Sequence, residues 1–377
     1  MNNISRRIMS VIVVLALVFS ISSFGSASAT SASTITSQEI STLMDGSLGD
    51  LLCTVKSSPD LLGLDSSKVS TAYLGNPFTI ACVEGDEIDS KTNINYIPLI
   101  SEGEIIAIVT ILKNGNEYDC SIGIDFADEL DAYLKSENND VALVFNNYDL
   151  LAVDSSSNNE VLYNYPDEVS TYSLSAPISY SEVSLNTNVV DYSSLCNESY
   201  SLPNVPVSRA YNYFSSYPIV FQGDLPICWA AVVASMVMYE MPSEYPELYA
   251  TQVCNKIGHS YTGGSPSVDV VNALNAYLPD VYVPTYFSYA MSTSAVKTII
   301  DNNDPAYMSS YRIDDSSSRH GTALCGYSVS GSTFQIRLMD PAYECFKFST
   351  YTNSVFRFAF GSQTYQWSAT VRLLYNV

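Results

Sequence analysis

The sequence predicts an α+β fold in which the two halves of the chain differ in character. Runs of β-branched and aromatic residues separated by turn signals dominate the first half, which indicates an antiparallel sheet with one or two helices on it. The second half places apolar and amphipathic helical patterns ahead of a long β-hairpin. At 377 residues, the chain is long enough for two domains.

Residues 1–29 have the pattern of a secretory signal peptide. Two arginines precede an apolar run from Ile8 to about Ile21, and Ala27-Ser28-Ala29 forms a small-residue cleavage site. The apolar run is too short and wrongly flanked for a stable membrane anchor, and no later stretch is apolar for long enough to span a bilayer. We therefore expect a secreted, extracellular product with no membrane association after the signal is cleaved.

The net charge of −23 is unevenly distributed. Residues 1–210 contain 27 acidic and 8 basic side chains, whereas residues 211–377 contain 12 and 8. The acidic first half argues against nucleic acid or an anionic membrane as a partner. The chain has only two histidines and lacks Cys-x-x-Cys spacing, so we expect no metal site and no cofactor.

Residues 30–162 are predicted to form an α+β domain. The expected helices are Gln38–Leu52 and Asp125–Ser136, and Asn114-Gly115 is a hairpin signal between two strands. The expected strands are Ala72–Val83, Ile94–Ser101, Glu104–Lys113, Glu117–Ile124, Val141–Asn146 and Tyr148–Asp154. This domain has no histidine and no pair of carboxylates with a recognisable catalytic role.

Residues 163–210 are predicted to be a linker, because Ser, Asn, Tyr and Pro dominate and hydrophobic periodicity is absent. Exposed linkers are where proteolytic nicking concentrates. Arg209 is the only basic residue between Lys135 and Lys256, so Arg209-Ala210 is one candidate cleavage position.

The predicted catalytic domain, residues 211–377, begins with the most informative stretch of the chain. Cys228–Glu240 is apolar nearly all round and is predicted to be a buried helix that ends before Pro242. Cys228 lies in its first turn, where unpaired N–H groups and the helix dipole favour a thiolate over a thiol. Gln222 precedes it by six residues and is placed to donate its amide to a developing oxyanion. If Cys228 stays free, this domain holds at most one internal disulfide.

The second informative stretch runs from Arg319 to Gly331; it is strand-like, ends at the turn signal Ser330-Gly331, and is followed by a second predicted strand, Thr333–Asp340. A two-residue loop at Ser330-Gly331 places His320 opposite Pro341, and a loop one residue longer places it opposite Asp340. Cross-strand neighbours on one face lie within side-chain reach, so we expect the imidazole and the carboxylate to meet. The other expected elements are helices at Pro246–Ile257, 266–278 and Thr293–Asn302, and a strand at Ala306–Ile313.

Three segments resemble the active-site segments of papain-like cysteine peptidases of the compact secreted bacterial (staphopain-like) type. The first is Gln222 followed, after five residues, by Cys228-Trp229-Ala230; the others are His320 with Gly326-Tyr327, and Asp340-Pro341. The resemblance implies a two-lobed catalytic domain in which Cys228 is the nucleophile, His320 the base, Asp340 its orienting partner and Gln222 an oxyanion donor. Papain itself has asparagine as the third member. An aspartate stabilises an imidazolium more strongly, and here the motif looks like that of bacteriocin-leader-processing peptidases.

The same resemblance implies that residues 30–162 are a cystatin-like inhibitory propeptide, so the chain's partners are a protein or peptide substrate and its own pro-domain, and we expect a monomer. A permanent accessory or binding domain is the alternative. For the whole protein, the alternatives are a transglutaminase or an amidase with the same triad, or an inactive secreted binding protein. His259 is the other candidate base, but the sequence suggests no carboxylate partner for it. Trp229 and Trp367 are predicted to pack in the core.

Overall fold

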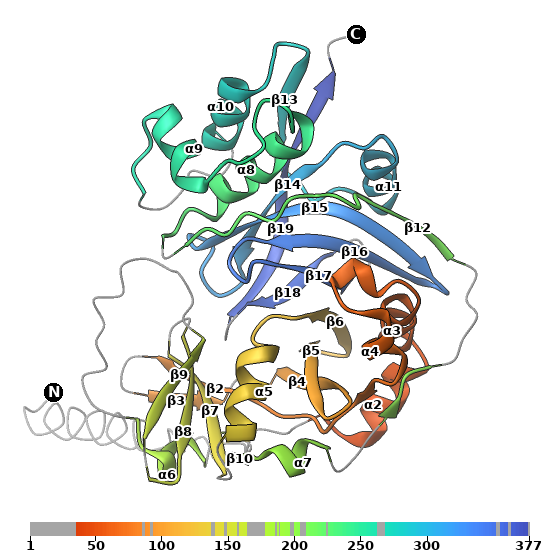
Figure 1. The fold of residues 1–377 in the computed structure, drawn as a ribbon, viewed down its shortest axis with the longest axis vertical. Coiled ribbons are helices and arrows are strands. Elements are labelled where there is room, and N and C mark those ends of the chain that lie inside the picture. Colours follow the sequence, from red (N-terminus) through yellow and green to blue (C-terminus); the bar gives the residue numbers. More distant parts are fainter. Residues whose placement is uncertain are drawn as a thin grey trace, which may run out of the picture.

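The computed structural model confirms an α+β protein with antiparallel sheets (Figure 1). It describes residues 35–377 except for short segments, which are residues 85–86, 91–92, 137–139, 147–148, 157, 164–177, 185–186, 188, 197–199, 204–208, 224, 262–267, 352–354, 361–362 and 376–377. The predicted signal peptide, residues 1–29, lies outside the described residues. Among the helices that are described, none combines the length and the apolar character needed to cross a bilayer.

The N-terminal half combines four α-helices with strands of two sheets. Its described helices are α2 (Ser37–Met44), α3 (Ser47–Ser57), the 3₁₀ helix η1 (Pro59–Leu62), α4 (Ser66–Ser70) and α5 (Ala127–Ser136). Its strands are β1 (Tyr73–Leu74), β2 (Ala81–Glu84), β3 (Glu87–Ser90), β4 (Ile94–Ser101), β5 (Glu104–Asn114), β6 (Glu117–Gly123), β7 (Val141–Asn146), β8 (Asp149–Asp154) and β9 (Asn159–Tyr163). Strands β3, β2, β7, β8 and β9 form the smaller sheet in this order, and a sixth strand, Val189–Val190, also pairs with β7. Among the described pairs of this sheet, β2 and β7 run parallel and the others antiparallel.

The C-terminal half consists of a helical layer and a long antiparallel sheet. Its helices are α8 (Cys228–Glu240), α9 (Ala250–Ile257), α10 (Val268–Tyr277) and α11 (Thr293–Asp301). Its strands are β13 (Tyr282–Phe287), β14 (Ala306–Arg312), β15 (Arg319–Ser330), β16 (Thr333–Asp340), β17 (Cys345–Thr350), β18 (Arg357–Phe360) and β19 (Gln363–Tyr375). Helices α8, α9 and α10 pack together, and α8 contacts β14 and β15 (Figure 1).

The predicted linker contains regular structure where it is described: α6 (Tyr180–Val183), β10 (Val189–Val190), α7 (Tyr192–Cys196), β11 (Tyr200–Ser201) and β12 (Arg209–Tyr213). Strand β10 pairs with β7 and β11 pairs with β1, both in the N-terminal half, whereas β12 pairs with β15 in the C-terminal half. The candidate cleavage position Arg209-Ala210 therefore lies at the start of a paired strand.

Two of the predicted N-terminal elements are divided in the structure. The predicted helix Gln38–Leu52 is two helices, α2 and α3, with Gly46 as the N-cap of α3. A Cβ atom at Gly49 would lie 1.9 Å from the carbonyl oxygen of Met44, so the sharp turn between the helices requires glycine there. The predicted strand Ala72–Val83 is divided into β1 and β2.

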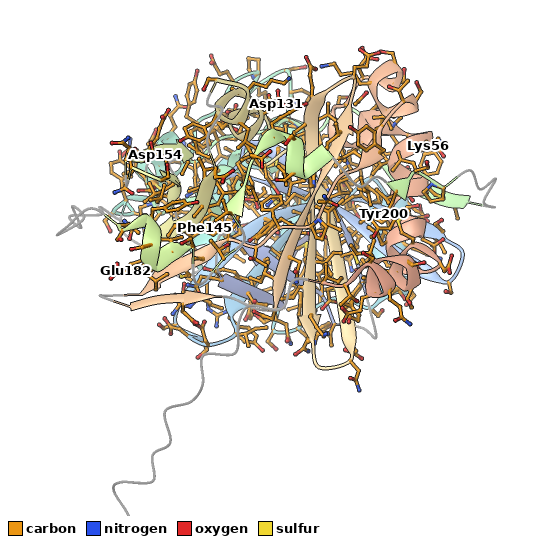
Figure 2. The ribbon with its side chains drawn as sticks, turned by 90° about the horizontal axis from the view of Figure 1, so that it is seen from below. Lys56, Asp131, Phe145, Asp154, Glu182 and Tyr200 are labelled. Carbon is orange, nitrogen blue, oxygen red and sulfur yellow. The ribbon has the colours of Figure 1, made fainter. Side chains whose placement is uncertain are left out.

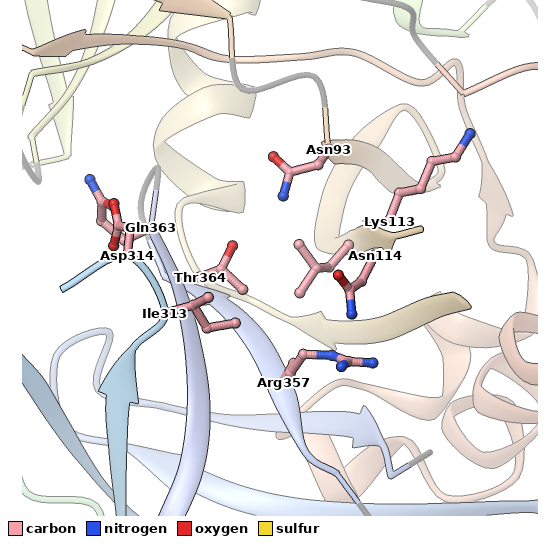
Figure 3. A pocket seen from close by; sticks show the side chains of 9 residues that line it. Asn93, Lys113, Asn114, Ile313, Asp314, Arg357, Gln363 and Thr364 are labelled. Carbon is pink, nitrogen blue, oxygen red and sulfur yellow. The ribbon is translucent and has the colours of Figure 1, made fainter. Parts of the chain in front are cut away.

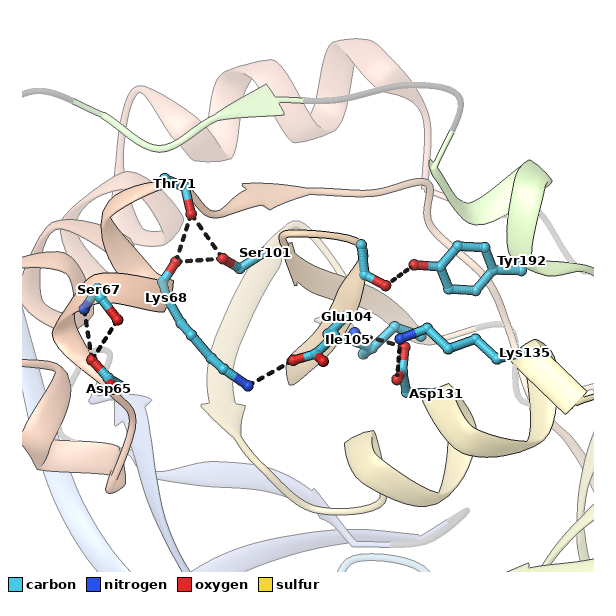
Figure 4. A network of polar contacts seen from close by, with 11 residues as sticks. Asp65, Ser67, Lys68, Thr71, Ser101, Glu104, Ile105, Asp131, Lys135 and Tyr192 are labelled. Carbon is cyan, nitrogen blue, oxygen red and sulfur yellow. Dashed lines mark hydrogen bonds and ion pairs between the residues drawn. The ribbon is translucent and has the colours of Figure 1, made fainter.

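Polar side chains cover much of the outer surface of the N-terminal half. One network joins Lys68 to Glu104 at 2.6 Å, and nearby Asp131 accepts a hydrogen bond from the N–H of Ile105 (Figure 4). In Figure 2, Lys56, Asp131, Asp154 and Glu182 spread over this half of the molecule. Because water screens exposed ion pairs of this kind, the buried core carries most of the stability.

The two halves share one 13-stranded sheet, which the sequence did not predict. Strand β6 of the N-terminal half pairs with β17 of the C-terminal half, with Ile122 opposite Phe348 (Figure 1). Phe348 is fully buried and belongs to the hydrophobic core of the N-terminal half, together with Leu51 and Ile122. Each half therefore depends on the other for part of its packing.

Polar contacts reinforce the junction between the halves. Asp50 of α3 accepts a hydrogen bond from the Thr333 hydroxyl at 2.7 Å. The buried Arg337 donates across the junction to the carbonyl oxygen of Leu61 at 2.8 Å, and within its own half to that of Phe214 at 3.1 Å. Buried donors and acceptors that lose such partners are costly, so these contacts disfavour separation of the halves.

We predict that Phe348→Ala destabilises both halves together by about 3–5 kcal/mol, because it leaves a cavity in their shared core. Both tryptophans, Trp229 and Trp367, are buried in the C-terminal half, so their fluorescence reports on that half while far-UV circular dichroism reports on the whole. The urea unfolding transitions followed by fluorescence and by circular dichroism should coincide in the wild type, and the variant should lower both midpoints by the same amount. Phe221→Ala, at a side chain 40% exposed, is the control with little effect. A shift in circular dichroism alone would contradict the shared core.

Candidate active site

Cys228 is the first residue of α8, as its sequence predicts. The following residues of the helix, Trp229 to Val237, are buried, which fixes α8 in the core of the C-terminal half. The Cys228 Sγ accepts a hydrogen bond from the Gly321 N–H at 3.3 Å. Among the cysteines that the structure describes, Cys228 alone is not fully buried. It therefore combines a helix N-terminus with access for a reactant.

The β15–β16 hairpin brings His320 and Asp340 together through a register that differs from the predicted one. The turn is Gly331-Ser332 rather than Ser330-Gly331, and Ser330 pairs with Thr333. A β-bulge between Leu324 and Gly326 then shifts the ladder by one residue.

The bulge decides which face His320 occupies. Beyond it, Ala323 pairs with Met339, so the next position outward, Thr322, lies opposite Asp340. His320 is two residues from Thr322 and therefore shares its face of the sheet with Asp340. Without the bulge, Ala323 would lie opposite Asp340 and His320 would point to the other face.

The imidazole and the carboxylate form a buried pair. His320 Nε2 lies 2.9 Å from Asp340 Oδ1, and the two residues are 3% and 0% exposed. The Ala342 N–H donates to the same Oδ1 at 3.1 Å, and Lys347 Nζ lies 3.4 Å from Oδ2. Because Nε2 is taken by Asp340, Nδ1 is the ring nitrogen left for Cys228.

The electrostatics favour a charged imidazole. Burial lowers the pKa of His320, but the charge and hydrogen bond of Asp340, and then the interaction with Cys228, raise it from 6.5 to about 10. Burial likewise raises the pKa of Asp340, but the charges of His320 and Lys347 bring it down from 3.8 to about 2. The arrangement thus holds an imidazolium against a carboxylate beside the Cys228 thiol.

Gln222 is buried near the same end of the sheet. Its backbone N–H donates to the carbonyl oxygen of Pro341 at 3.0 Å, which ties the segment before α8 to the residue after Asp340. Its side-chain Nε2 donates to the Leu225 carbonyl at 3.1 Å. The structure therefore places Gln222 beside the triad segment, with its amide engaged within its own loop.

Sequence reasoning missed the residues that surround this arrangement. Tyr307 is buried against Gly321, where a Cβ atom would lie 2.7 Å from Cε2 of the tyrosine ring, so only glycine fits beside the Cys228 sulfur. The rings of Phe358 and Tyr365 lie 6.2 and 6.0 Å from that of His320. Lys347 also escaped prediction, because nothing local to β17 indicates that it lies beside Asp340.

The prediction that His259 lacks a carboxylate partner is wrong. His259 Nε2 lies 3.4 Å from Asp269 Oδ2, and its ring packs edge-on against Trp229 at 5.1 Å. Asp269 belongs to α10, a helix that begins one residue earlier, so the contact is tertiary and left no local signal. Both Trp229 and Trp367 are buried, which confirms their predicted packing.

Among the described cysteines there is no disulfide, and the described residues contain no group of three or more His, Cys, Asp or Glu side chains able to hold a metal ion. One pocket of about 240 Å³ lies between the two halves, with Asn93, Lys113 and Asn114 on one side and Ile313, Asp314 and Thr364 on the other (Figure 3). None of its lining residues is a predicted site residue.

Comparison with known proteins adds no assignment: no protein-family model matches the chain, and no curated protein matches its sequence. Cys228, His320 and Asp340 are therefore the residues whose geometry indicates a function.

The pKa values predict how pH acts on stability. The pKa of His320 is raised from 6.5 to about 10 by folding, so its contribution is complete below pH 6.5 and is lost as the pH rises towards 10. The pKa of Asp340 is lowered from 3.8 to about 2, so its contribution is complete above pH 3.8 and is lost as the pH falls through 2. Both residues therefore contribute their full stabilisation only between pH 3.8 and pH 6.5.

Urea unfolding at several pH values between 6.5 and 10 provides the measurement. The free energy of unfolding of the wild type should fall more steeply over this interval than that of His320→Gln, which lacks the titrating group. His259→Gln is the matched control and should keep the steep wild-type fall. Equal slopes in wild type and His320→Gln would show that folding does not raise the pKa of His320.

Proposed function

We propose that this chain is a secreted, papain-like cysteine endopeptidase that is made as an inactive precursor. One observation carries the proposal: a partly accessible cysteine at a helix N-terminus lies beside a histidine whose other nitrogen is held at 2.9 Å by a buried aspartate. Acyl transfer requires a nucleophile next to a base that is itself held by an orienting group.

In the proposed reaction, the Cys228 thiolate attacks the carbonyl carbon of a peptide bond. The His320 imidazolium gives its proton to the leaving amine as the C–N bond breaks, which leaves a thioester. Water then attacks the thioester while His320 takes its proton, and the thiolate leaves. Asp340 holds the imidazole through Nε2, so that Nδ1 faces the sulfur and carries the proton.

Gln222 and the Cys228 N–H are the proposed oxyanion donors. The hydrogen bond from the Gln222 N–H to the Pro341 carbonyl supports this role, since it holds the glutamine next to Asp340. In the structure, Gln222 Nε2 donates to the Leu225 carbonyl. We infer that the amide exchanges this partner for the oxyanion, whose negative charge makes it the stronger acceptor.

We further propose that α8, α9 and α10 form one lobe of a papain-like domain, that the β14–β19 sheet forms the other, and that the substrate binds between them. In the same proposal, residues 30–162 are a cystatin-like pro-domain that helps folding and holds the precursor inactive. The junction at β6 and β17 supports a close association of this half with the catalytic half. Processing between residues 163 and 210 would begin activation.

We predict that an epoxide selective for papain-like thiols labels Cys228 and none of the other described cysteines in the processed protein, because those are buried. Peptide mapping gives the labelled position, and unfolded casein serves as the substrate. Cys228→Ala should lose the label and the activity. His320→Ala should lose at least about 10³-fold in kcat/KM, since thiolate formation and leaving-group protonation both depend on it.

Cys254→Ala, at a buried cysteine of the same half, is the matched control and should keep both label and activity. A folded, processed protein that takes no label and cuts no casein contradicts the peptidase proposal. Incorporation of an amine into casein would indicate a transglutaminase, and release of peptide from cell-wall material would indicate an amidase. Substrate binding without turnover would indicate an inactive binding protein.

We predict that Gln222→Ala lowers kcat by about 10²–10³-fold with little change in KM, because an oxyanion donor acts in the transition state. Gln252→Ala, at a surface glutamine that caps α9, is the control and should leave kcat unchanged. Steady-state kinetics on a peptide substrate separates kcat from KM. An unchanged kcat in Gln222→Ala would remove this residue from the oxyanion site.

A further inference from the structure

A buried lysine connects the N-terminal half to the triad. Lys347 Nζ lies 2.8 Å from Asp125 Oδ1 and 3.4 Å from Asp340 Oδ2. The side chains of Lys347, Asp125 and Asp340 are only 6%, 9% and 0% exposed, so water screens none of these charges effectively. Asp125 comes from the N-terminal half and Asp340 from the C-terminal half.

The topology of the shared sheet creates this contact. Lys347 of β17 lies opposite Gly123 of β6 on one side and opposite Leu338 of β16 on the other. A Cβ atom at Gly123 would lie 3.0 Å from Lys347 Cγ and 3.1 Å from Asp125 Oδ1, so a glycine there leaves room for both side chains. Asp125 follows two residues later with φ of 31°, a strained value that turns the chain back towards the lysine before α5.

One cation is therefore shared between two buried carboxylates. The other titratable groups around it are Cys345, whose Sγ lies 3.7 Å from Asp125 Oδ1, and Tyr343, whose ring centroid is 4.0 Å from Lys347 Nζ. Tyr96 of β4 is buried and interacts electrostatically with both Asp125 and Lys347. Burial raises the pKa of Tyr96, Cys345 and Asp125, although the charge of Lys347 opposes it in each.

We propose that Lys347 is a positioning residue of the triad, and that Asp125 of the N-terminal half controls through it how much of the Asp340 charge acts on His320. Asp125 makes the shorter contact and draws the ammonium towards itself. Without Asp125, Lys347 turns to Asp340 and neutralises it, so the imidazolium of His320 is less stabilised. Without Lys347, the Asp340 carboxylate acts on His320 undiminished. The catalytic meaning rests on the proposed function, but the electrostatic coupling does not.

The test measures the titration of His320 in the full-length chain. Because the chain has only two histidines, ¹³C-histidine labelling gives two histidine signals, and His259→Gln assigns that of His320. Cys228→Ala is the common background, since it removes the proposed nucleophile and with it any cleavage of the chain by its own active site. In this background, Asp125→Asn should lower the midpoint of the His320 titration and Lys347→Met should raise it, each by about one pH unit.

The double variant, Asp125→Asn with Lys347→Met, tests whether Asp125 acts on His320 through Lys347. If Asp125 acts only through Lys347, adding Asp125→Asn to Lys347→Met leaves the raised His320 midpoint unchanged. This variant also removes both buried charges, so it avoids the unpaired Asp125 that could unfold Lys347→Met alone. Lys347→Arg keeps the charge and should keep the wild-type midpoint.

Three results would overturn the proposal. They are a His320 midpoint in the folded double variant equal to that of the Cys228→Ala background, shifts of equal sign in the two single variants, or an effect of Asp125→Asn that persists without Lys347. A lysine that only packs the interface would change the stability of every variant and leave the His320 midpoint in place. Because the His320 titration is measured without substrate turnover, its result supports or overturns this proposal independently of the epoxide and casein results.

Discussion

The buried carboxylate of Asp340 is the constraint around which the two halves are arranged. A fully buried charge is costly unless it has several partners, and Asp340 has His320, the Ala342 N–H and Lys347. The lysine in turn needs a second carboxylate, which comes from Asp125 across the β6–β17 junction. The charge balance of the candidate active site is therefore completed by a residue outside the C-terminal half.

Small backbone features make this arrangement possible. The bulge at Cys325 puts His320 and Asp340 on the same face of the hairpin, and Gly321 lets the chain pass Tyr307 while its N–H reaches the Cys228 sulfur. Neither feature changes the composition of the strands. Each changes the direction in which a side chain points. For a triad, this direction matters more than the β-propensity of the strand that carries the side chain.

Elements with a strong local pattern could be predicted from the sequence, and contacts between distant elements could not. Helix Cys228–Glu240 and strand Thr333–Asp340 have their predicted bounds, and His320 meets Asp340 as expected. The hairpin turn was predicted one residue too early, because Ser330-Gly331 and Gly331-Ser332 are both turn signals. The pairing of β6 with β17, and hence Asp125 beside Lys347, leaves no periodic pattern because it joins segments more than 200 residues apart.

The position of Phe348 affects the order in which the chain folds during synthesis. The core that surrounds it is otherwise built mainly from the N-terminal half, which leaves the ribosome first. Strand β17, which contains Phe348, is synthesised only near the end of translation, so until then this core lacks the Phe348 side chain and β6 lacks β17 as its partner. Completion of this core is therefore coupled to the synthesis of nearly the whole chain.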